Sequence, residues 1–355
     1  MYTVIKMKRN ETRKIYVGSV AIGGGAAVSV QSMCNTPTQD AEKSLAQIKA
    51  LAAAGCDIVR LAVPDMAAAG AMERIAAESP IPVVADIHFD HRLALECARV
   101  GVHKIRINPG NIGGEDNVRA VAEACGEKNI PIRIGVNSGS IEKELLRKYG
   151  SPTPEAMVES AEKHIAMLTN CGFHDICLSL KASSVPLTVE ACRLAAEKFP
   201  YPLHLGVTEA GTSYMGLVQS AVGIGTLLNE GIGDTIRVSL TADPTEEITA
   251  GIAILKSAGL RKGGVKIVSC PTCGRTQIDL ISTAKEVEQR LSDCKKDIRV
   301  AVMGCVVNGP GEAKEADFGL AGGKGEAVLF KKGEIVSKVA EKDLVSALLK
   351  LIDEG

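Results

Sequence analysis

The chain of 355 residues has no tryptophan, and aromatic residues make up only 3% of it. Proteins that hold single-stranded nucleic acid or carbohydrate stack bases or sugars on aromatic rings, so this composition argues against both classes. Neither sign of charge is in excess, with 41 Lys and Arg against 42 Asp and Glu. The net charge of −1 therefore provides no basic surface for nucleic acid and no acidic tail.

Segments that would cross or target a membrane are also missing. A long uncharged stretch, residues 210–229, contains Gly, Ser, Thr, Gln and Asn, which favours a buried loop and helix over a membrane span. The first residues, MYTVIKMKRNETRK, lack the apolar core of a signal peptide. Eleven cysteines without an export signal indicate a reducing compartment, where they are thiols or metal ligands. We expect a cytoplasmic protein that binds neither membranes nor nucleic acid.

What the chain does have is a repeated pattern and enough apolar residues, 46%, for a large core. From Val28 onward, a β-branched run, a polar or glycine-rich turn and an Ala/Leu-rich amphipathic stretch recur about every 25 residues. Eight such units predict an α/β fold, a (β/α)8 TIM barrel. An open doubly wound sheet is the alternative, but no phosphate-binding glycine fingerprint follows the first run. The expected strands are 28–33, 57–63, 83–88, 104–108, 132–137, 176–181, 203–208 and 235–241.

Segments outside the eight units predict a hairpin before the barrel and a second domain after it. Residues 13–27 read as a hairpin turning at Gly23-Gly24-Gly25, which would close the bottom of the barrel. After a break at Gly263-Gly264 the pattern changes to strands 265–269 and 298–302, helix 277–294, a hairpin near Gly333 and helix 341–353. We expect a barrel domain over 1–260 and a small α+β domain over 264–355.

Polar side chains occupy one face of each expected strand. Residues two apart on a strand share a face, and here one face is polar and the other apolar. Buried charges are costly unless paired or solvated, so we place them at the carboxyl ends of the strands, where a ligand completes the pairing. The polar face carries Ser29, Gln31, Arg60, Asp86, His88, Lys104, Arg106, Asn108, Arg133, Asn137, Ser179, Lys181, His204, Thr208, Arg237, Ser239 and Thr241.

Four arginines and two lysines against few acids leave a positive surplus on this face. Planar guanidinium groups suit phosphate oxygens, so the surplus predicts a small phosphate or diphosphate substrate. For any single arginine, a structural ion pair is the alternative reading. Asp86, His88 and Glu209 are the acid–base candidates, and His88 equally suits a hydrogen-bonded structural histidine.

Two cysteine motifs lie in the second expected domain. CPTC places Cys270 and Cys273 on one turn, and MGCVVNGPGE places Cys305 at the end of another strand. Three thiols suit a structural zinc or an iron–sulfur cluster, and the lack of a second CxxC disfavours zinc. If they hold a four-iron cluster, the nearest oxygen ligand for the remaining iron is Glu312, and an exchangeable carboxylate would open that iron to substrate.

With these residues in view, the chain resembles the 4-hydroxy-3-methylbut-2-en-1-yl diphosphate synthase family in its bacterial two-domain form. The resemblance runs from about Arg13 to the C-terminus. It rests on the motifs VRLAVPD, ADIHFD, KIRINPGN, PIRIGVNSGS, SLKAS, GVTEAG, SLTADP, CPTCGRT and MGCVVNGPGEA.

The resemblance implies a TIM barrel followed by a domain similar to the cluster domain of sulfite and nitrite reductases. It also implies the two-electron reductive opening of 2-C-methyl-D-erythritol 2,4-cyclodiphosphate with loss of water, in the methylerythritol phosphate route to isoprenoids. Cys270, Cys273, Cys305 and Glu312 would hold a [4Fe–4S] cluster, and reduced flavodoxin or ferredoxin would supply electrons. Glu209 would lie near the reacting hydroxyl carbon. The substrate-binding residues implied by the resemblance are Arg60, Arg106, Arg133, Asn137, Lys181 and Ser239, to which the residue pattern adds Asp86, Asn108, His204 and Arg237.

The connection between the expected domains is short and starts after the eighth barrel helix, which runs toward the bottom of the barrel. A cluster domain tethered there does not easily reach its own barrel mouth. We therefore adopt the arrangement that the resemblance implies, a head-to-tail homodimer in which each cluster domain caps the partner's barrel.

Two other functions remain open at this level. One is a phosphate-binding barrel enzyme of different chemistry, such as an aldolase or a pterin-type transferase, with a structural zinc domain. The other is a metal-bound regulatory or scaffold protein whose barrel only binds a metabolite. Iron with acid-labile sulfide in the purified protein would favour the redox enzyme over both.

Overall fold

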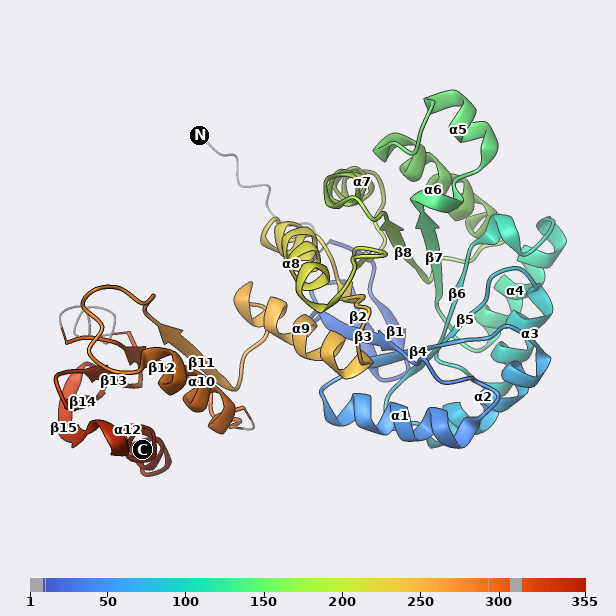
Figure 1. Ribbon diagram of the computed structural model, residues 1–355. Helices are drawn as coiled ribbons and strands as arrows, with labels where there is room; N and C mark the ends of the chain where they lie inside the picture. Colours follow the sequence, from blue (N-terminus) through green and yellow to red (C-terminus); the bar gives the residue numbers. More distant parts are fainter. Residues whose placement is uncertain (1–8, 10, 293, 307–314) are drawn as a thin grey trace. The chain divides into compact units, whose positions relative to one another are not determined.

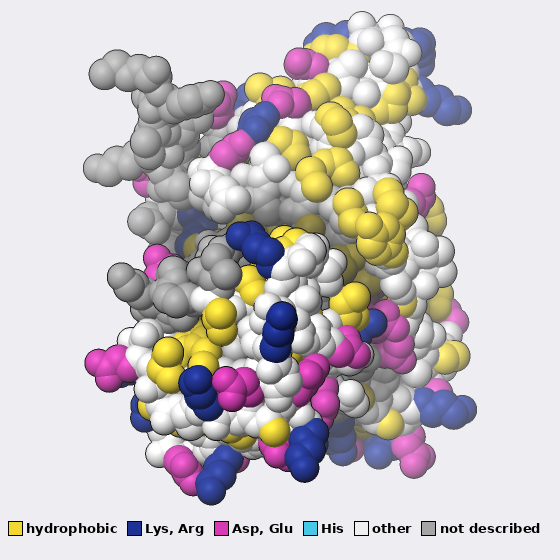
Figure 2. Space-filling model, turned by 60° about the vertical axis from the view of Figure 1, so that its left-hand side comes forward, with side chains coloured by type: hydrophobic (Ala, Val, Ile, Leu, Met, Phe, Trp, Pro, Cys, Tyr) yellow, Lys and Arg dark blue, Asp and Glu magenta, His cyan; other side chains and the backbone are white. Residues whose placement is uncertain are grey.

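The computed structural model describes residues 9, 11–292, 294–306 and 315–355. The chain divides into two compact units, Met1–Arg261 and Lys262–Gly355, coloured blue to orange and orange to red in Figure 1. Within the described residues, no helix combines the length and the apolarity that crossing a bilayer requires. On the face drawn in Figure 2, Lys and Arg lie among Asp and Glu, as expected from the balanced composition.

The first unit is a parallel (β/α)8 barrel, which confirms the predicted fold. Its eight strands follow the order β8-β7-β6-β5-β4-β3-β10-β9, and a bridge between Leu178 and Leu203 brings β8 next to β9. The strands are β3 (Ser29–Met33), β4 (Ile58–Ala62), β5 (Val83–Asp86), β6 (Lys104–Ile107), β7 (Ile132–Asn137), β8 (Ile176–Lys181), β9 (His204–Leu205) and β10 (Thr235–Ile236).

The helices surround the barrel, and most begin where a short polar side chain caps the first turn. Asp40, Asp65 and Asp90, for example, accept backbone N–H groups at the starts of α1, α2 and α3. Helix α5 and the short 3-10 turns were not predicted. The elements are α1 (Ala41–Ala53), α2 (Met66–Glu78), α3 (His91–Val100), η2 (Pro109–Asn111), α4 (Glu115–Glu127), η3 (Ser138–Ser140), α5 (Lys143–Tyr149), α6 (Pro154–Thr169), α7 (Val185–Lys198), α8 (Ser213–Asn229) and α9 (Pro244–Ser257).

A hairpin closes the floor of the barrel. Its strands, β1 (Ile15–Val17) and β2 (Val20–Ile22), pair antiparallel. Ile15, Val17 and Ile22 pack against inward-facing apolar side chains of β4, β5 and β8. The predicted turn at Gly23-Gly24-Gly25 is wrong, because the chain reverses between β1 and β2 at Gly18, whose φ of +57° suits glycine. The three glycines come after β2 instead.

The second unit is an α+β domain with one five-stranded sheet. The sheet order is β11-β12-β13-β14-β15, in which the first three strands are parallel and the last two antiparallel. Helices α10 and α12 supply apolar side chains to its core. The elements are β11 (Val265–Ser269), α10 (Leu280–Arg290), β12 (Ile298–Met303), β13 (Phe318–Gly322), β14 (Glu326–Lys331), β15 (Glu334–Ala340), η4 (Glu341–Asp343) and α12 (Leu344–Asp353).

Candidate active site

A polar cavity lies at the carboxyl ends of the barrel strands. Seven of the eight strands, or the residues just after them, contribute side chains to it. All of these side chains lie on the face that the alternation in the sequence marked as polar. The lining residues are Arg60, Asp86, His88, Arg106, Arg133, Asn137, Ser179, Lys181, Thr208, Arg237 and Ser239.

The cavity holds far more positive than negative charge. Four arginines and Lys181 line it, against a single carboxylate, Asp86. Asp86 accepts a hydrogen bond from Arg106 Nη1 at 3.1 Å, and its other oxygen lies 3.7 Å from Arg60 Nε. Burial alone would raise the pKa of Asp86, but the nearby cations hold it below its ordinary value, so this group is a carboxylate. Even with Glu247 of α9, which pairs with Arg237 from behind the lining, two carboxylates cannot neutralise five cations, and the remainder favours an anionic ligand.

The contacts of Arg60 show the same shortage of acceptors. Its Nε and Nη2 atoms lie 3.1 and 2.8 Å from the sulfur of Met33, a weak hydrogen-bond acceptor. The same sulfur lies 3.6 Å from Nη1 of Arg237. Burial lowers the pKa of Arg60 well below its ordinary value, and the neighbouring arginines lower it further. An anion bound between these guanidinium groups would relieve both the repulsion and the poor hydrogen bonding.

Some predicted substrate-binding residues do not line this cavity. Asn108 is buried just after β6 and accepts a hydrogen bond from the backbone N–H of Gly110. His204 is fully buried on β9, with Nδ1 3.4 Å from Thr235 Oγ1. Glu209 is exposed in the loop between β9 and α8, where its backbone has a φ of +53°. These two substrate-binding candidates and Glu209, which was predicted as catalytic, thus lie outside the cavity lining.

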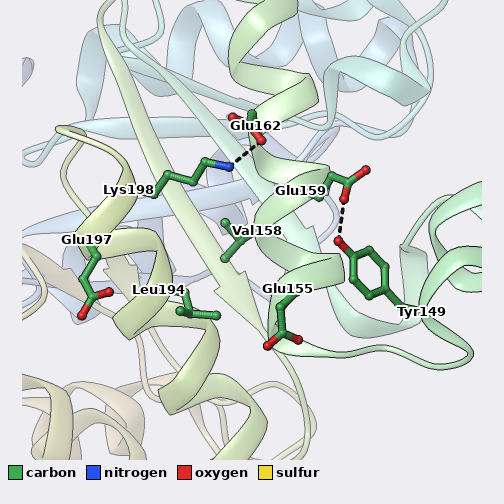
Figure 3. Close-up of a pocket in the computed structure, with 8 residues that line it drawn as sticks. All are labelled: Tyr149, Glu155, Val158, Glu159, Glu162, Leu194, Glu197 and Lys198. Carbon is green, nitrogen blue, oxygen red and sulfur yellow. Dashed lines mark hydrogen bonds and ion pairs between the residues drawn. The ribbon is translucent and has the colours of Figure 1, made fainter.

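A second cavity, between α6 and α7, has the opposite charge. Figure 3 shows Glu155, Glu159, Glu162 and Glu197 around it, with Lys198 as the single cationic side chain drawn. Lys198 donates a hydrogen bond to Glu162 at 2.6 Å. Such a lining repels phosphate groups, so the anion site is the cavity at the barrel mouth and not this groove.

In the second unit, parallel strand pairing brings two of the predicted cysteine ligands to one edge of the sheet. Cys270 follows β11 and Cys305 follows β12, and these strands pair with Ser269 opposite Val302. The backbone N–H of Gly304 donates to Cys270 Sγ at 3.2 Å. Hydrogen bonds from backbone N–H groups to cysteine sulfur are typical of iron–sulfur sites, since they stabilise thiolate charge.

Cys273, in the exposed turn after β11, also suits a thiolate ligand. Backbone and side-chain hydrogen bonds from Arg275 lower the pKa of the Cys273 thiol below its ordinary value. All eleven cysteines are free thiols, and Cys294, which was not predicted as a ligand, is half-buried beside the core of this unit. In the described part of the chain, no three His, Cys, Asp or Glu side chains converge on one metal ion, and Glu312 lies outside the described residues. Thiolates are the donors that iron–sulfur clusters use, so these residues fit such a group by their chemistry, although the described side chains do not converge on one metal position.

Comparison with known proteins decides the family. Residues 12–252 match the GcpE TIM-barrel domain, and residues 266–354 match the GcpE protein C-terminal domain. The chain belongs to the GcpE family. A curated relative from Clostridium perfringens, named 4-hydroxy-3-methylbut-2-en-1-yl diphosphate synthase (flavodoxin), is 63% identical over 98% of this chain and 99% of its own. One of the same name from Ruminiclostridium cellulolyticum is 60% identical over 98% and 99%.

Solved structures of other enzymes share the barrel of this GcpE chain. A dihydropteroate synthase from Yersinia pestis covers 69% of this chain and 98% of its own, with a TM-score of 0.50 and 14% identity. At that identity the likeness shows the fold alone. It agrees with the barrel predicted from the sequence and says nothing of the substrate.

The GcpE site also contains an acid that the sequence did not reveal. Glu247, buried on α9, lies 3.4 Å from Arg237 Nε through its Oε2 atom. The same carboxylate accepts hydrogen bonds from Ser32 Oγ at 3.0 Å and from the backbone N–H of Leu240 at 3.1 Å. Glu247 thus fixes Arg237 from outside the barrel wall. In the sequence, the one feature that could have indicated this role is an acidic residue on the apolar side of its helix.

Two glycines in the GcpE barrel make room for cavity side chains. A Cβ atom on Gly135 of β7 would lie 2.6 Å from Arg106 Nε, and one on Gly206 would lie 2.6 Å from Lys181 Nζ. Any larger residue at these positions would push the cation away from its place in the cavity. In the sequence, the signal was a glycine at an inward position of a strand, where branched apolar residues are usual.

Proposed function

We propose that this protein is a 4-hydroxy-3-methylbut-2-en-1-yl diphosphate synthase. It opens the ring of 2-C-methyl-D-erythritol 2,4-cyclodiphosphate by two-electron reduction and eliminates water, as an oxidoreductase of isoprenoid biosynthesis. The observation that carries the proposal is a cavity with five cations and one carboxylate, in a chain 63% identical to a relative named for this activity. A cyclic diphosphate supplies the anionic oxygens that such a cavity needs.

Different residues around the cavity bind different parts of this substrate. Arg60, Arg106 and Arg133 offer planar pairs of N–H donors to the diphosphate oxygens, and Lys181 adds a point charge. Asn137, the last residue of β7, and Ser239, which follows β10, bind and orient the polar groups of the ring. Negative charge on the leaving diphosphate oxygen grows as the C–O bond breaks, so these fixed cations stabilise the transition state more than the bound substrate.

The proposed cofactor is a [4Fe–4S] cluster held by Cys270, Cys273, Cys305 and Glu312. Such a cluster, when bound, supplies single electrons and an iron with a labile carboxylate ligand. The relatives' name includes flavodoxin, and we propose a reduced flavodoxin as electron donor, with ferredoxin as the alternative. Eleven free thiols agree with the cytoplasmic location that we propose. We assign Glu209 to the neighbourhood of the reacting hydroxyl carbon.

Turnover of the cyclodiphosphate by anaerobically purified protein with reduced flavodoxin tests the function. The expected product is 4-hydroxy-3-methylbut-2-en-1-yl diphosphate, identified by mass spectrometry, with iron and acid-labile sulfide in the protein. Absence of this product from iron-loaded protein would reject the proposal. Stoichiometric zinc without iron would instead favour a barrel enzyme of other chemistry.

Substitution of Arg133 by Met should weaken substrate binding about 10- to 100-fold, because lost hydrogen bonds to a charged ligand cost roughly 1.5–3 kcal/mol. Isothermal titration of the oxidised protein with the cyclodiphosphate measures this. Arg74→Met, which removes an exposed arginine paired with Glu78 on α2, is the control and should bind as wild type. Equal affinity in Arg133→Met and wild type would remove Arg133 from the substrate site.

The surface of α8 supports the proposed homodimer. The helix has no charged residue over Ser213–Asn229. It exposes Tyr214, Met215, Val218 and Val222, with exposed fractions from 39% to 76%. A contiguous uncharged surface of this kind suits contact with a second copy of the chain. The last barrel helix, α9, starts after β10 on the side of the mouth and leads away from it to Ser257. We therefore propose that each cluster domain serves the partner's barrel.

Mixed dimers test this arrangement. Arg133→Met weakens substrate binding by a barrel and Cys305→Ser disables a cluster, so at a substrate concentration well below the KM of Arg133→Met each variant alone should have little activity. After subunit exchange of equal amounts, half of the dimers carry one variant of each kind, and one of their two sites is intact when capping is in trans. We expect about a quarter of wild-type activity to return. No recovery, with exchange verified by tagged subunits, would mean that each chain uses its own cluster.

A further inference from the structure

Strand β3 reaches the mouth of the barrel with a methionine. In the described part of the chain, β3 supplies no residue to the cavity lining, whereas each of the other seven strands, or the residues just after it, does. The last residue of β3 is Met33, which is half-buried. Residues two apart on a strand share a face, and Ser32 points out of the barrel to Glu247 of α9. Met33 therefore faces the interior at the carboxyl end of β3.

Met33 stands between two arginines of the cavity. It lies opposite Arg60 in the pairing of β3 with β4, and β10, which Arg237 follows, pairs with β3 on the other side. Its sulfur lies 3.1 and 2.8 Å from Nε and Nη2 of Arg60 and 3.6 Å from Nη1 of Arg237. Among the described residues, this sulfur is the only hydrogen-bond acceptor of Arg60, since Asp86 Oδ2 is 3.7 Å from Nε. One thioether thus separates two guanidinium groups of like charge.

The chemistry of a thioether suits this place. A hydrocarbon side chain would leave the Nε–H of Arg60 without an acceptor, and the two guanidinium groups would be free to move apart. A carboxylate would hold both groups firmly, but it would neutralise part of the charge that an anionic ligand needs. The sulfur of methionine is uncharged, polarisable and a weak acceptor. It can therefore hold the guanidinium groups and still leave their charge to the ligand.

We propose that Met33 is a positioning residue of the anion site. Its sulfur keeps Arg60 and Arg237 apart and in the orientation that the substrate needs, through contacts weak enough for a diphosphate oxygen to compete with. The strength of the acceptor at this position therefore limits how tightly the cavity binds an anion. The inference rests on the proposed function and gives Met33 itself no part in the chemistry.

Stronger acceptors at position 33 test the effect on affinity without any turnover. Met33→Gln and Met33→Glu place an amide or a carboxylate oxygen beside the two arginines on a side chain of similar length. Isothermal titration of the oxidised holoenzyme with the cyclodiphosphate should give an affinity about 10-fold lower for Gln and about 100-fold lower for Glu, the range of neutral and charged hydrogen bonds. Met66→Gln and Met66→Glu, at an exposed methionine of α2, should bind as wild type. Wild-type affinity in both Met33 variants would overturn the proposal.

Thermal melting separates this role from simple packing. The cavity holds five cations against Asp86 in its lining and Glu247 behind it, so a third carboxylate between two arginines relieves repulsion. The midpoint of Met33→Glu should therefore rise by about 2–4 °C while its affinity for the anion falls. At a methionine that only fills space, a new carboxylate would cost stability instead. A midpoint below that of wild type would overturn the proposal.

Removal of the sulfur tests the positioning of the arginines. Met33→Leu keeps nearly the same volume but offers no acceptor. Its kcat should fall about 10-fold while KM changes less than about threefold, because the guanidinium groups still attract the anion but no longer fix its orientation. Wild-type kcat in Met33→Leu would overturn the proposal. Failure of wild type to turn over the bound cyclodiphosphate would instead count against the proposed function, and the titrations would still decide the role of Met33.

Discussion

Cys305→Ser should yield a folded protein that holds little iron and has no measurable turnover. Cys305 is buried after β12 and lies at the same end of the sheet as Cys270, which follows the paired strand β11. Serine is a poor ligand for a cluster that is otherwise held by thiolates, and loss of one of three cysteines should remove the cluster. Iron and acid-labile sulfide per chain, visible absorbance and turnover with reduced flavodoxin measure the outcome.

The matched control for this prediction is Cys294→Ser. Cys294 lies in the same unit and is half-buried against the same core, but it is not part of the proposed ligand set. It should keep its iron and its activity. If both variants lose iron alike, the effect is a general one on the fold of this unit. If Cys305→Ser keeps full activity, the ligand assignment is wrong.

Gly135→Ala should lower kcat/KM about 100-fold although it adds one methyl group and changes no charge. The new Cβ would lie 2.6 and 2.7 Å from Nε and Nη2 of Arg106, so the guanidinium must move out of its place beside Asp86. Displacement of a substrate-positioning group by about 1 Å is enough for a loss of this size. The close atoms all belong to one flexible side chain, and we expect the barrel to fold normally.

Gly126→Ala is the control for this substitution, because Gly126 lies in α4 with nothing within 4 Å of an added Cβ. It should leave kinetics unchanged and stabilise the helix slightly. Circular dichroism and thermal melting of both variants separate a local displacement from unfolding. Wild-type kinetics in Gly135→Ala would show that Arg106 does not need its present position for catalysis.

The sequence was most informative where structure depends on short-range periodicity. Strands β7 and β8 begin and end where the pattern predicted them, and each cavity residue lies on the predicted polar face. Alternation with a period of two is a local property, and it determines which face of a strand a side chain occupies. The predicted ends of β9 and β10 were too late, since β9 ends at Leu205 and β10 at Ile236. The two chains stay close beyond these ends, because the backbone N–H of Arg237 donates to Leu205 O at 2.9 Å and a Cβ on Gly206 would lie 2.5 Å from the carbonyl oxygen of Arg237.

The same alternation could not predict how deep along the barrel axis each inward-facing side chain lies. Lys104 and Arg106 lie two residues apart on one face of β6, yet Arg106 lines the cavity and Lys104 is buried behind it. The level of each residue depends on the stagger between neighbouring strands, which no single strand encodes. The pairing of Glu247 with Arg237 depends on how α9 packs on the barrel, which is also a tertiary property.

The hairpin under the barrel limits the route by which substrate and product enter and leave the enzyme. Because Ile15, Val17 and Ile22 seal the interior from below, the barrel, as far as its described residues show, opens only at the carboxyl ends of its strands. Substrate enters and product leaves through that same opening. Substrate and product therefore cannot pass through the opening together. Each catalytic cycle ends only when the product has left it.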